Sequence, residues 1–372
     1  MRPDIVVIGA GTVGAAIAYG LAKRGEAVLM LDGDDGDFRA AQANFGLVWL
    51  QGKGPGMPAY QALTRSSVDL WRGFCDELQD SEGIDLAYEQ NGGIAFCLGE
   101  EGFEKRRVDL LRLHNQRGDG EPDWEMLDRI ELQKLMPKAE LGPDVSGASF
   151  GRRDGHVNPL KLLSALHSAV LRHGGAIRHR ARVERITPEG EGFRLHVGAE
   201  TMTAPRIVIA AGLGSADLAR QVGLDVPLRP ERGQVLVTER LSPFLPLPAS
   251  GLRQTSEGTV MIGATKDNPG FDTSATAEAA SGLSRKTVRI VPALANVRLV
   301  RQWAGLRIMT PDSYPIYAQS PSHPGAFVAL CHSGVTLAAV HSEMLAGVIA
   351  TGALPDTLSP FHQSRFDVPQ AA

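Results

Sequence analysis

Hydrophobic positions recur with two different periods along this chain, and the change of period separates two kinds of structure. A continuous apolar run at 5–8 leads into glycines and a helical pattern, and a second apolar run at 27–31 ends at Asp32. This order predicts a strand, a helix and a second, buried strand. Alternating apolar and polar positions at 234–238 and 259–263 instead predict antiparallel strands.

Other segments extend both patterns. Helical spacing of apolar residues predicts helices at 60–78, 100–117, 160–173 and 333–351, and short apolar runs predict strands at 85–89, 92–98, 176–178, 181–186 and 205–212. Because the two kinds of segment alternate along the sequence, we expect a mixed α/β (α+β) fold of two interleaved domains. The expected Rossmann-like dinucleotide-binding domain comprises 1–80, 145–222 and 300–372, and an antiparallel-sheet substrate domain comprises 81–144 and 223–299.

The first unit carries the glycine spacing of a dinucleotide-binding turn. Gly9 allows the tight turn after the strand, Gly11 lets a pyrophosphate approach the backbone, and Gly14 lets helix and strand pack closely. The phosphates would lie at the helix N-terminus, where free N–H groups favour negative charge. Asp32 would accept hydrogen bonds from the adenosine ribose, and its carboxylate disfavours the 2′-phosphate of NADP.

Composition narrows the class further. The 372 residues carry a formal charge of −4, so no basic surface indicates nucleic-acid binding. Cys75, Cys97 and Cys331 are far apart, which argues against a disulfide framework, a zinc site or an iron–sulfur cluster held by this chain alone, and we expect no metal site. The apolar stretch 5–22 contains four glycines and is a poor membrane span. We therefore expect a cytoplasmic protein, or one peripheral to a membrane.

Four motifs in order along the chain resemble one family. They are the glycine fingerprint, the small-residue strand at 207–212, the run 301–307 with Thr-Pro-Asp at 310–312, and His-Ser-Gly at 332–334. Together they resemble the FAD-dependent D-amino acid oxidase/glycine oxidase/sarcosine oxidase family. The segment 44–54 is most similar to the β subunits of octopine and nopaline oxidases, to those of D-hydroxyproline dehydrogenase, and to the catalytic subunit of hydrogen cyanide synthase.

The resemblance implies roles for four residues near the reacting atoms. Arg307, in the Gly-Leu-Arg motif, would grip the substrate carboxylate, since a guanidinium binds a planar carboxylate with two hydrogen bonds. The alternative is a surface or ion-paired arginine. His332 could contact flavin or substrate, or could equally be a capping or packing residue. Tyr60 and Trp303 are candidate pocket walls, although aromatic residues are more often part of a core.

The resemblance also implies a path for the cofactor, FAD. The residues expected along it are Gly9, Gly11, Thr12, Val13, Gly14, Asp32, Gly33, Ala41, Asn44, Phe45, Gly46, Leu47, Val48, Val183, Ala211, Gly212, Trp303, Gly305, Arg307, Ser333, Gly334, Val335 and Thr336. A helix beginning at Gly334 would point its N-terminus at the flavin and stabilise negative charge there. Sarcosine oxidases carry a flavin-tethering cysteine shortly before Thr-Pro-Asp. The run 305–309 contains none, so we expect non-covalent FAD.

The expected activity is oxidation of the C–N bond of an amino or imino acid, by hydride transfer from the α-carbon to flavin without a dedicated base. Opines, D-hydroxyproline, D-proline, sarcosine and glycine all remain open, with a secondary amine preferred on resemblance alone. We expect the chain to act as the catalytic β subunit of a dehydrogenase complex, with an FAD/NAD-type α subunit and in some cases a [2Fe–2S] subunit, and in this way to reach the inner membrane peripherally. The alternatives are a free-standing oxidase that uses O2, an NAD-dependent dehydrogenase, and a flavin-binding scaffold subunit.

Overall fold

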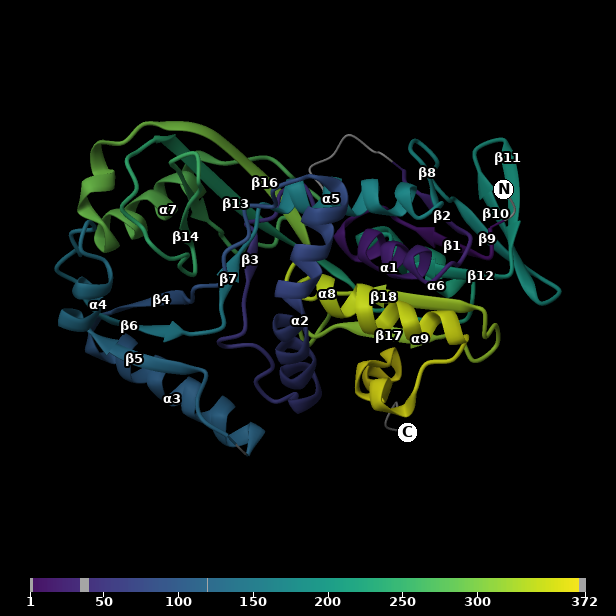
Figure 1. Ribbon diagram of the computed structural model, residues 1–372, viewed down its shortest axis with the longest axis horizontal. Helices are drawn as coiled ribbons and strands as arrows, with labels where there is room; N and C mark the ends of the chain where they lie inside the picture. The colour runs from purple at the N-terminus through teal and green to yellow at the C-terminus, as the bar shows by residue number, and fades with distance from the viewer. Residues whose placement is uncertain (1–2, 34–39, 119, 368–372) are drawn as a thin grey trace.

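A six-stranded sheet forms the core of one half of the molecule, on the right of Figure 1. The computed structural model describes residues 3–33, 40–118 and 120–367. All neighbouring strands of this sheet are parallel except β17 and β18, the antiparallel pair at one edge. In spatial order the strands are β17 (Ile316–Gln319), β18 (Ala326–Leu330), β12 (Arg206–Ile209), β1 (Ile5–Ile8), β2 (Val28–Leu31) and β8 (Ala176–Arg178).

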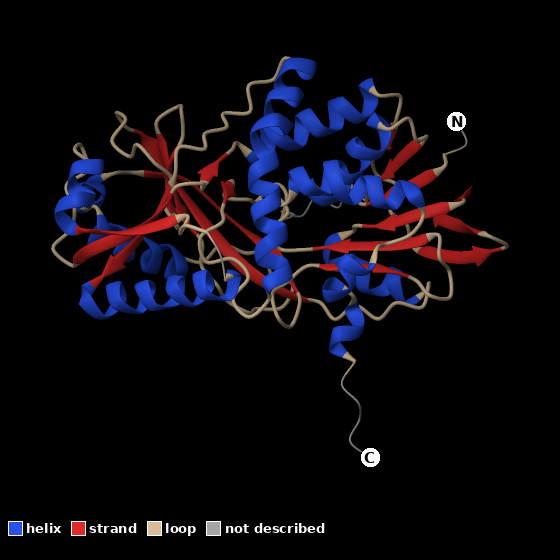
Figure 2. Ribbon diagram, turned by 60° about the horizontal axis from the view of Figure 1, so that its bottom comes forward, coloured by secondary structure: helices blue, strands red, loops and turns tan. Residues whose placement is uncertain are grey.

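Helices cover one face of this sheet (Figure 2). They are α1 (Thr12–Lys23), α2 (Pro58–Glu82), α5 (Pro159–Arg172) and the C-terminal segments α8 (Ala338–Val340) and α9 (Ala346–Thr351), which a π-helical turn at His341–Leu345 joins. α1 packs directly against this π-helical turn, since a Cβ on Gly20 would lie 2.1 Å from the carbonyl oxygen of Ser342. The first and last parts of the chain therefore share one core.

The other face carries a three-stranded antiparallel sheet. Its strands are β9 (Arg185–Glu189), β10 (Gly192–Val197) and β11 (Glu200–Ala204), and α6 (Ser215–Arg220) lies beside them after a 3₁₀ turn at Gly212–Gly214. Buried side chains such as Phe193 and Leu195 join Ile8 and Ile207 in one cluster. The central strands are therefore apolar on both faces, as the continuous apolar runs predicted.

Antiparallel sheets form the second half, on the left of Figure 1. One contains β13 (Arg229–Arg240), β14 (Leu252–Gln254), β15 (Thr259–Gly263) and β16 (Leu299–Met309), in the order β14-β15-β13-β16. The other has the order β4-β6-β5, from β4 (Gly93–Leu98), β5 (Trp124–Asp128) and β6 (Val145–Gly151). The helices of this half are α3 (Gly99–Arg117), α4 (Arg129–Leu135) and α7 (Ala277–Ile290). The short pair β3 (Leu47–Val48) and β7 (Gly155–His156) lies where the halves meet.

Most elements follow the sequence prediction, and three differ. The strand predicted at 85–89 is wrong, because only Glu89 pairs, in a single bridge to His156. The strand predicted at 181–186 begins only at Arg185. The helix predicted from Ser333 begins only at Ala338. The mixed α/β fold is confirmed, whereas the exact domain boundaries remain a prediction.

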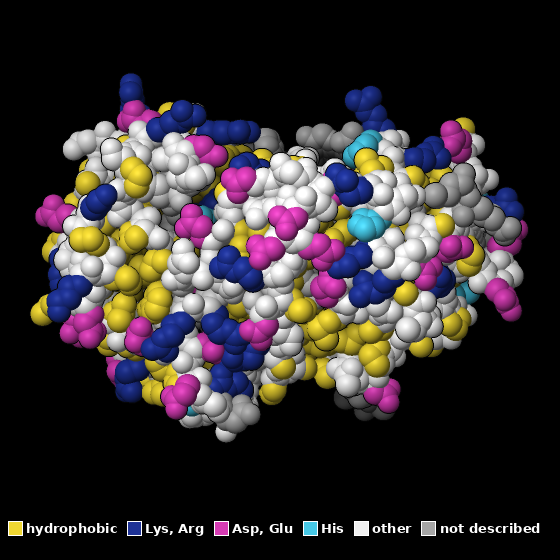
Figure 3. All heavy atoms as spheres, viewed as in Figure 1, with side chains coloured by type: hydrophobic (Ala, Val, Ile, Leu, Met, Phe, Trp, Pro, Cys, Tyr) yellow, Lys and Arg dark blue, Asp and Glu magenta, His cyan; other side chains and the backbone are white. Residues whose placement is uncertain are grey.

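The surface carries charges of both signs. Lys and Arg side chains are interspersed with Asp and Glu over the face in Figure 3, without a broad field of one sign. None of the helices in the described part of the chain is long and apolar enough to cross a membrane.

Candidate functional site

The turn after β1 is a close-packed cradle. Gly9 has φ +106°, and a Cβ on it would lie 2.4 Å from the carbonyl oxygen of Ala210. A Cβ on Gly14 would lie 1.9 Å from the carbonyl oxygen of Gly9, so helix and strand touch through bare backbone. The carboxylate of Asp32 accepts a hydrogen bond of 2.9 Å from the backbone N–H of Ala10. Turn, helix and acid therefore have the relation that the glycine spacing predicted.

This cradle suits a dinucleotide on two observations. Among the described residues, a Cβ on Gly11 would meet only the Cβ of Ala41, at 3.8 Å, so they leave the backbone beside the N-terminus of α1 open to close approach. The Oγ1 of Thr12, in the first turn of α1, is buried without a hydrogen-bond partner among the described residues. Val183 lies in the buried segment next to Asp32, since Ala181 N–H donates to the Asp32 carbonyl at 2.8 Å.

Residues 40–48, expected along the cofactor, are tied to segments far away in the sequence. The indole N–H of Trp303 donates to the carbonyl of Ala43 at 3.2 Å. The Thr336 hydroxyl donates to the carbonyl of Leu47 and accepts from the N–H of Trp49, both at 3.2 Å. Three of the predicted cofactor segments therefore meet here. Gly33 follows Asp32, just after β2, and residues 34–39 lie outside the described chain.

The remaining predicted residues surround the same region. Asn44 Oδ1 accepts from Gly46 N–H at 2.8 Å, and Gly46 has φ +86°. Gly212 has φ +59°, and a Cβ on it would lie 3.6 Å from Ile308 of β16. A Cβ on Gly334 would lie 3.2 Å from the Cγ2 of Val13. The other members of the predicted set are Phe45 and Val48 beside Asn44, Ala211 before Gly212, Gly305 on β16 and Val335 after Gly334.

Ser333 is the centre of a hydrogen-bond cluster. Its hydroxyl oxygen accepts from Lys53 Nζ at 2.8 Å and from the Tyr60 hydroxyl at 2.9 Å, and it lies 3.0 Å from Nδ1 of His332. A serine hydroxyl has two lone pairs and one hydrogen. With both lone pairs used, Ser333 donates its hydrogen to His332 Nδ1. The cluster thus fixes the proton position on the histidine.

His332 is therefore a neutral donor. Burial, together with the charges of Lys53, Arg307 and Lys266, lowers the pKa of His332 to about 3. With Nδ1 accepting from Ser333, the single ring proton lies on Nε2. The Nδ1 edge of the ring thus contacts Ser333, no described residue accepts a hydrogen bond from the Nε2–H, and the role of His332 stays a prediction.

Arg307, on β16, extends its side chain across the neighbouring strand β13 and forms an ion pair with Glu231. Its Nη1 donates to Glu231 at 3.1 Å and to the carbonyl of Arg232 at 3.4 Å, and its Nη2 donates to the carbonyl of Thr265 at 2.9 Å. A Cβ on Gly233 would lie 2.6 Å from Nη2, so that glycine makes room for the guanidinium. Burial lowers the pKa of Arg307. Three of the five guanidinium N–H groups are engaged by described residues, and two remain for a ligand.

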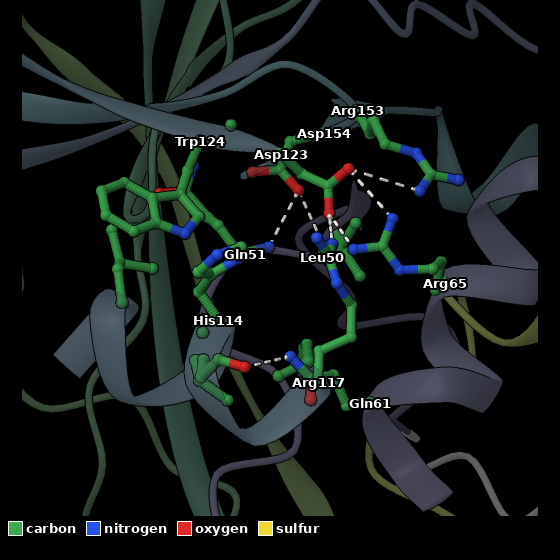
Figure 4. Close-up of a pocket in the computed structure, with 15 residues that line it drawn as sticks. Leu50, Gln51, Gln61, Arg65, His114, Arg117, Asp123, Trp124, Arg153 and Asp154 are labelled. Atoms are coloured by element: carbon green, nitrogen blue, oxygen red, sulfur yellow. Dashed lines mark hydrogen bonds and ion pairs between the residues drawn. The ribbon is translucent and has the colours of Figure 1, made fainter. Parts of the chain in front are cut away.

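A cavity lies beside this cluster (Figure 4), and Lys53, whose ammonium donates to Ser333, is one of the residues that line it. Leu50, Gln51, Lys53, Arg65 and Asp123 are among the residues that line it. Arg307, His332, Tyr60 and Trp303 do not line it. The cavity is therefore adjacent to the predicted site and separate from it. Among the described residues, no group of three or more His, Cys, Asp or Glu side chains could hold a metal ion.

Comparison with known proteins decides the family. Residues 4–348 match the family model of FAD dependent oxidoreductases. The chain belongs to this family. It is 42% identical to the B subunit of opine oxidase from Rhizobium meliloti and to that from Agrobacterium tumefaciens (strain Ach5), each over 99% of both chains. The crystal structure of glycine oxidase from Geobacillus kaustophilus superposes with a TM-score of 0.90 at 27% identity, covering 98% of this chain and 99% of that one.

The chain is therefore an oxidoreductase that uses FAD. The NAD-dependent alternative is wrong. The cradle at Gly9, Gly11 and Gly14 and the orphaned Thr12 hydroxyl fit the pyrophosphate, and Asp32 fits the ribose. The roles of individual residues remain predictions.

Three charged residues of the site are absent from the set that the sequence predicted. Glu231 pairs with Arg307 because β13 and β16 are neighbours in antiparallel register. Lys266 follows Thr265, whose carbonyl binds Arg307. Lys53 lies within the segment 44–54 that carried the resemblance, and its position between Gly52 and Gly54 was the one available signal.

Proposed function

We propose that this protein is the catalytic member of a heteromeric enzyme that oxidises opines. An opine is a secondary amine whose nitrogen joins two carbons, each bearing a carboxylate. The observation that supports the proposal is the 42% identity to the B subunit of opine oxidase over 99% of both chains. Because the match covers 99% of this chain, it spans the segments around Arg307 and Ser333.

Arg307 would bind the carboxylate next to the carbon that is oxidised. Its two unengaged N–H groups suit a planar carboxylate, and Glu231 holds the guanidinium in place across β13. Partial burial strengthens this interaction because the surrounding dielectric is low. The substrate amine and its α C–H are then held in one orientation.

The Ser333 cluster would complete the site. His332 offers a neutral Nε2–H donor, so it can bind an oxygen without adding charge, and Tyr60 holds the Ser333 hydroxyl. Bound FAD supplies the hydride acceptor for the oxidation. The imine product is then released to hydrolysis by water. No residue is assigned as a general base, because a neutral secondary amine can lose a hydride without one.

Electron transfer to a partner subunit is part of the proposal. The chain has three cysteines, all buried and unpaired, so it carries no iron–sulfur cluster ligands in a suitable group. An FAD/NAD-type α subunit, and in some complexes a [2Fe–2S] chain, would accept the electrons. Location in the cytoplasm, with peripheral attachment to the inner membrane through the complex, remains a prediction.

The test is an anaerobic panel on the purified flavoprotein. Octopine and nopaline should bleach the flavin absorbance at least about tenfold faster than glycine, D-proline or D-hydroxyproline, while turnover with O2 stays slow relative to an artificial acceptor. Fast turnover of glycine with O2 would instead support a free-standing oxidase, the function of the structurally similar glycine oxidase. No bleaching by any amine would leave only the scaffold role.

A further inference from the structure

Lys53 presents an ammonium group at the Ser333 cluster. One N–H donates to Ser333 at 2.8 Å, and an ammonium has three donors, so two remain. The same Ser333 oxygen accepts from Tyr60 and lies beside His332. Lys53 and His332 therefore direct donors to one region from two different segments of the chain.

The loop that carries Lys53 is fixed in position. Gly52, Gly54 and Gly56 all have positive φ, between +80° and +84°, a conformation that favours glycine. Lys53 N–H donates to the carbonyl of Leu50 at 3.1 Å. The side-chain amide of Gln116, on α3, accepts from Gly56 N–H at 2.7 Å and donates to the Gly54 carbonyl at 2.8 Å. Because the loop is already held in one conformation, a ligand that binds the ammonium does not have to order the loop backbone.

Positive charge exceeds negative charge around His332. Lys53, Arg307 and Lys266 are all near enough for their charges to act on its ring. Glu231 balances Arg307. Within the described part of the chain, neither Lys53 nor Lys266 forms an ion pair. The site is therefore left with two cations that a ligand could neutralise.

Asp154, the carboxyl group whose charge acts on Lys53, does not cancel this excess. Asp154 is fully buried, and its Oδ1 accepts from the backbone N–H of Leu50 at 2.5 Å and of Gln51 at 3.2 Å. Burial raises the pKa of Asp154 to about 7, so much of it is protonated at neutral pH. The Lys53 ammonium is poorly solvated, and this burial lowers its pKa to about 8. A carboxylate ligand would replace the missing solvent.

We propose that Lys53 binds the second carboxylate of the substrate while Arg307 binds the first. Lys53 would then select amines with two carboxylates over amines with one. The inference rests on the proposed function and assigns a specificity role within it.

A binding experiment tests Lys53 independently of turnover. The ligand pair is thiodiacetate, with two carboxylates, and (methylthio)acetate, with one; sulfur replaces the oxidisable nitrogen in both. Binding to the FAD-loaded protein is followed by the change in flavin absorbance. The wild type should bind thiodiacetate at least about tenfold more tightly than (methylthio)acetate. Lys53→Met should abolish this preference while leaving the affinity for (methylthio)acetate within about twofold, and Lys53→Arg should retain most of it.

Two results would overturn the proposal. One is a wild type without preference for thiodiacetate. The other is an equal loss for both ligands in Lys53→Met, which would mean that Lys53 only supports Ser333. Lys286→Met, which removes an exposed charge on α7, is the matched control and should behave as the wild type. If the thiodiacetate preference is present but opines do not bleach the flavin, the subsite stands and the proposed substrate is wrong.

Discussion

Replacing Gly11 with alanine should separate cofactor binding from folding. Gly11 has φ −71° and ψ 179°, which alanine adopts without strain, and of the residues that the structure describes the new Cβ would meet only Ala41, at 3.8 Å from its Cβ. The folded apoprotein should therefore lose no more than about 1 kcal/mol, the typical cost of a poorer helix N-cap. The methyl group would nevertheless stand where the pyrophosphate must approach the backbone.

The loss in FAD affinity follows from the hydrogen bonds at risk. If the phosphates retreat and lose two bonds to the N-terminus of α1, each worth about 1.5–3 kcal/mol as a bond to a charged group, binding weakens by about 3 kcal/mol or more. This corresponds to roughly a hundredfold rise in Kd or more.

The assay is titration of the apoprotein with FAD, followed by quenching of flavin fluorescence, alongside urea unfolding of the apoprotein. Gly14→Ala is the contrasting variant. Its Cβ would lie 1.9 Å from the Gly9 carbonyl oxygen, so α1 must move away from β1, at a cost of about 3 kcal/mol of stability. Wild-type FAD affinity in Gly11→Ala would refute the placement of the pyrophosphate at this turn.

Three further measurements test the site. Arg307→Ala should raise KM for carboxylated amines about a hundredfold with flavin content intact. Arg298→Ala, which removes an exposed charge from the same half of the molecule, should leave KM unchanged. Steady-state kinetics with an artificial acceptor distinguish the two outcomes. Because Lys53 is charged only below its pKa of about 8, thiodiacetate binding should weaken as pH rises through 8, and His332, with a pKa of about 3, should add no step between pH 5 and 9. Acid precipitation should release all flavin into the supernatant; yellow colour left in the pellet would show a covalent link.

The sequence predicted the first unit of the fold well because its signals are local. The signals are the apolar strand, the glycines of the turn after it, and Asp32, all within the first 32 residues. Each of these residues is required by one feature of the dinucleotide-binding turn. The incorrect segments depend on distant contacts. The stretch at 85–89 is extended without a strand partner, apart from one bridge between Glu89 and His156. A strand depends on its neighbours, and the pattern within five residues does not reveal them.

The delayed start of the C-terminal helix has a similar cause. The carbonyl oxygen of Thr336 accepts from Ser67 Oγ at 2.7 Å and from the Trp71 indole at 2.9 Å, both on α2. It is therefore not the acceptor for Val340 N–H, which lies 3.4 Å from Ser67 Oγ instead. The residues before Ala338 form turns whose carbonyl groups accept hydrogen bonds from side chains of α2. A helical pattern in the sequence does not show that these side chains compete with the helix for its backbone acceptors.

The site shows the same division between local and distant information. A motif can place Arg307 near a substrate carboxylate, but whether the guanidinium is available depends on the strand beside it. The β13–β16 register sets Glu231 opposite Arg307, and Gly233, on the same strand as Glu231, leaves space for the guanidinium to lie across the sheet. Arg307 is thus ion-paired and still has two N–H groups for a ligand, so the two interpretations that the sequence left open are compatible. Because Glu231 already neutralises Arg307, selection for a doubly charged substrate has to come from other cations, and Lys53 is the one that the Ser333 cluster holds in place.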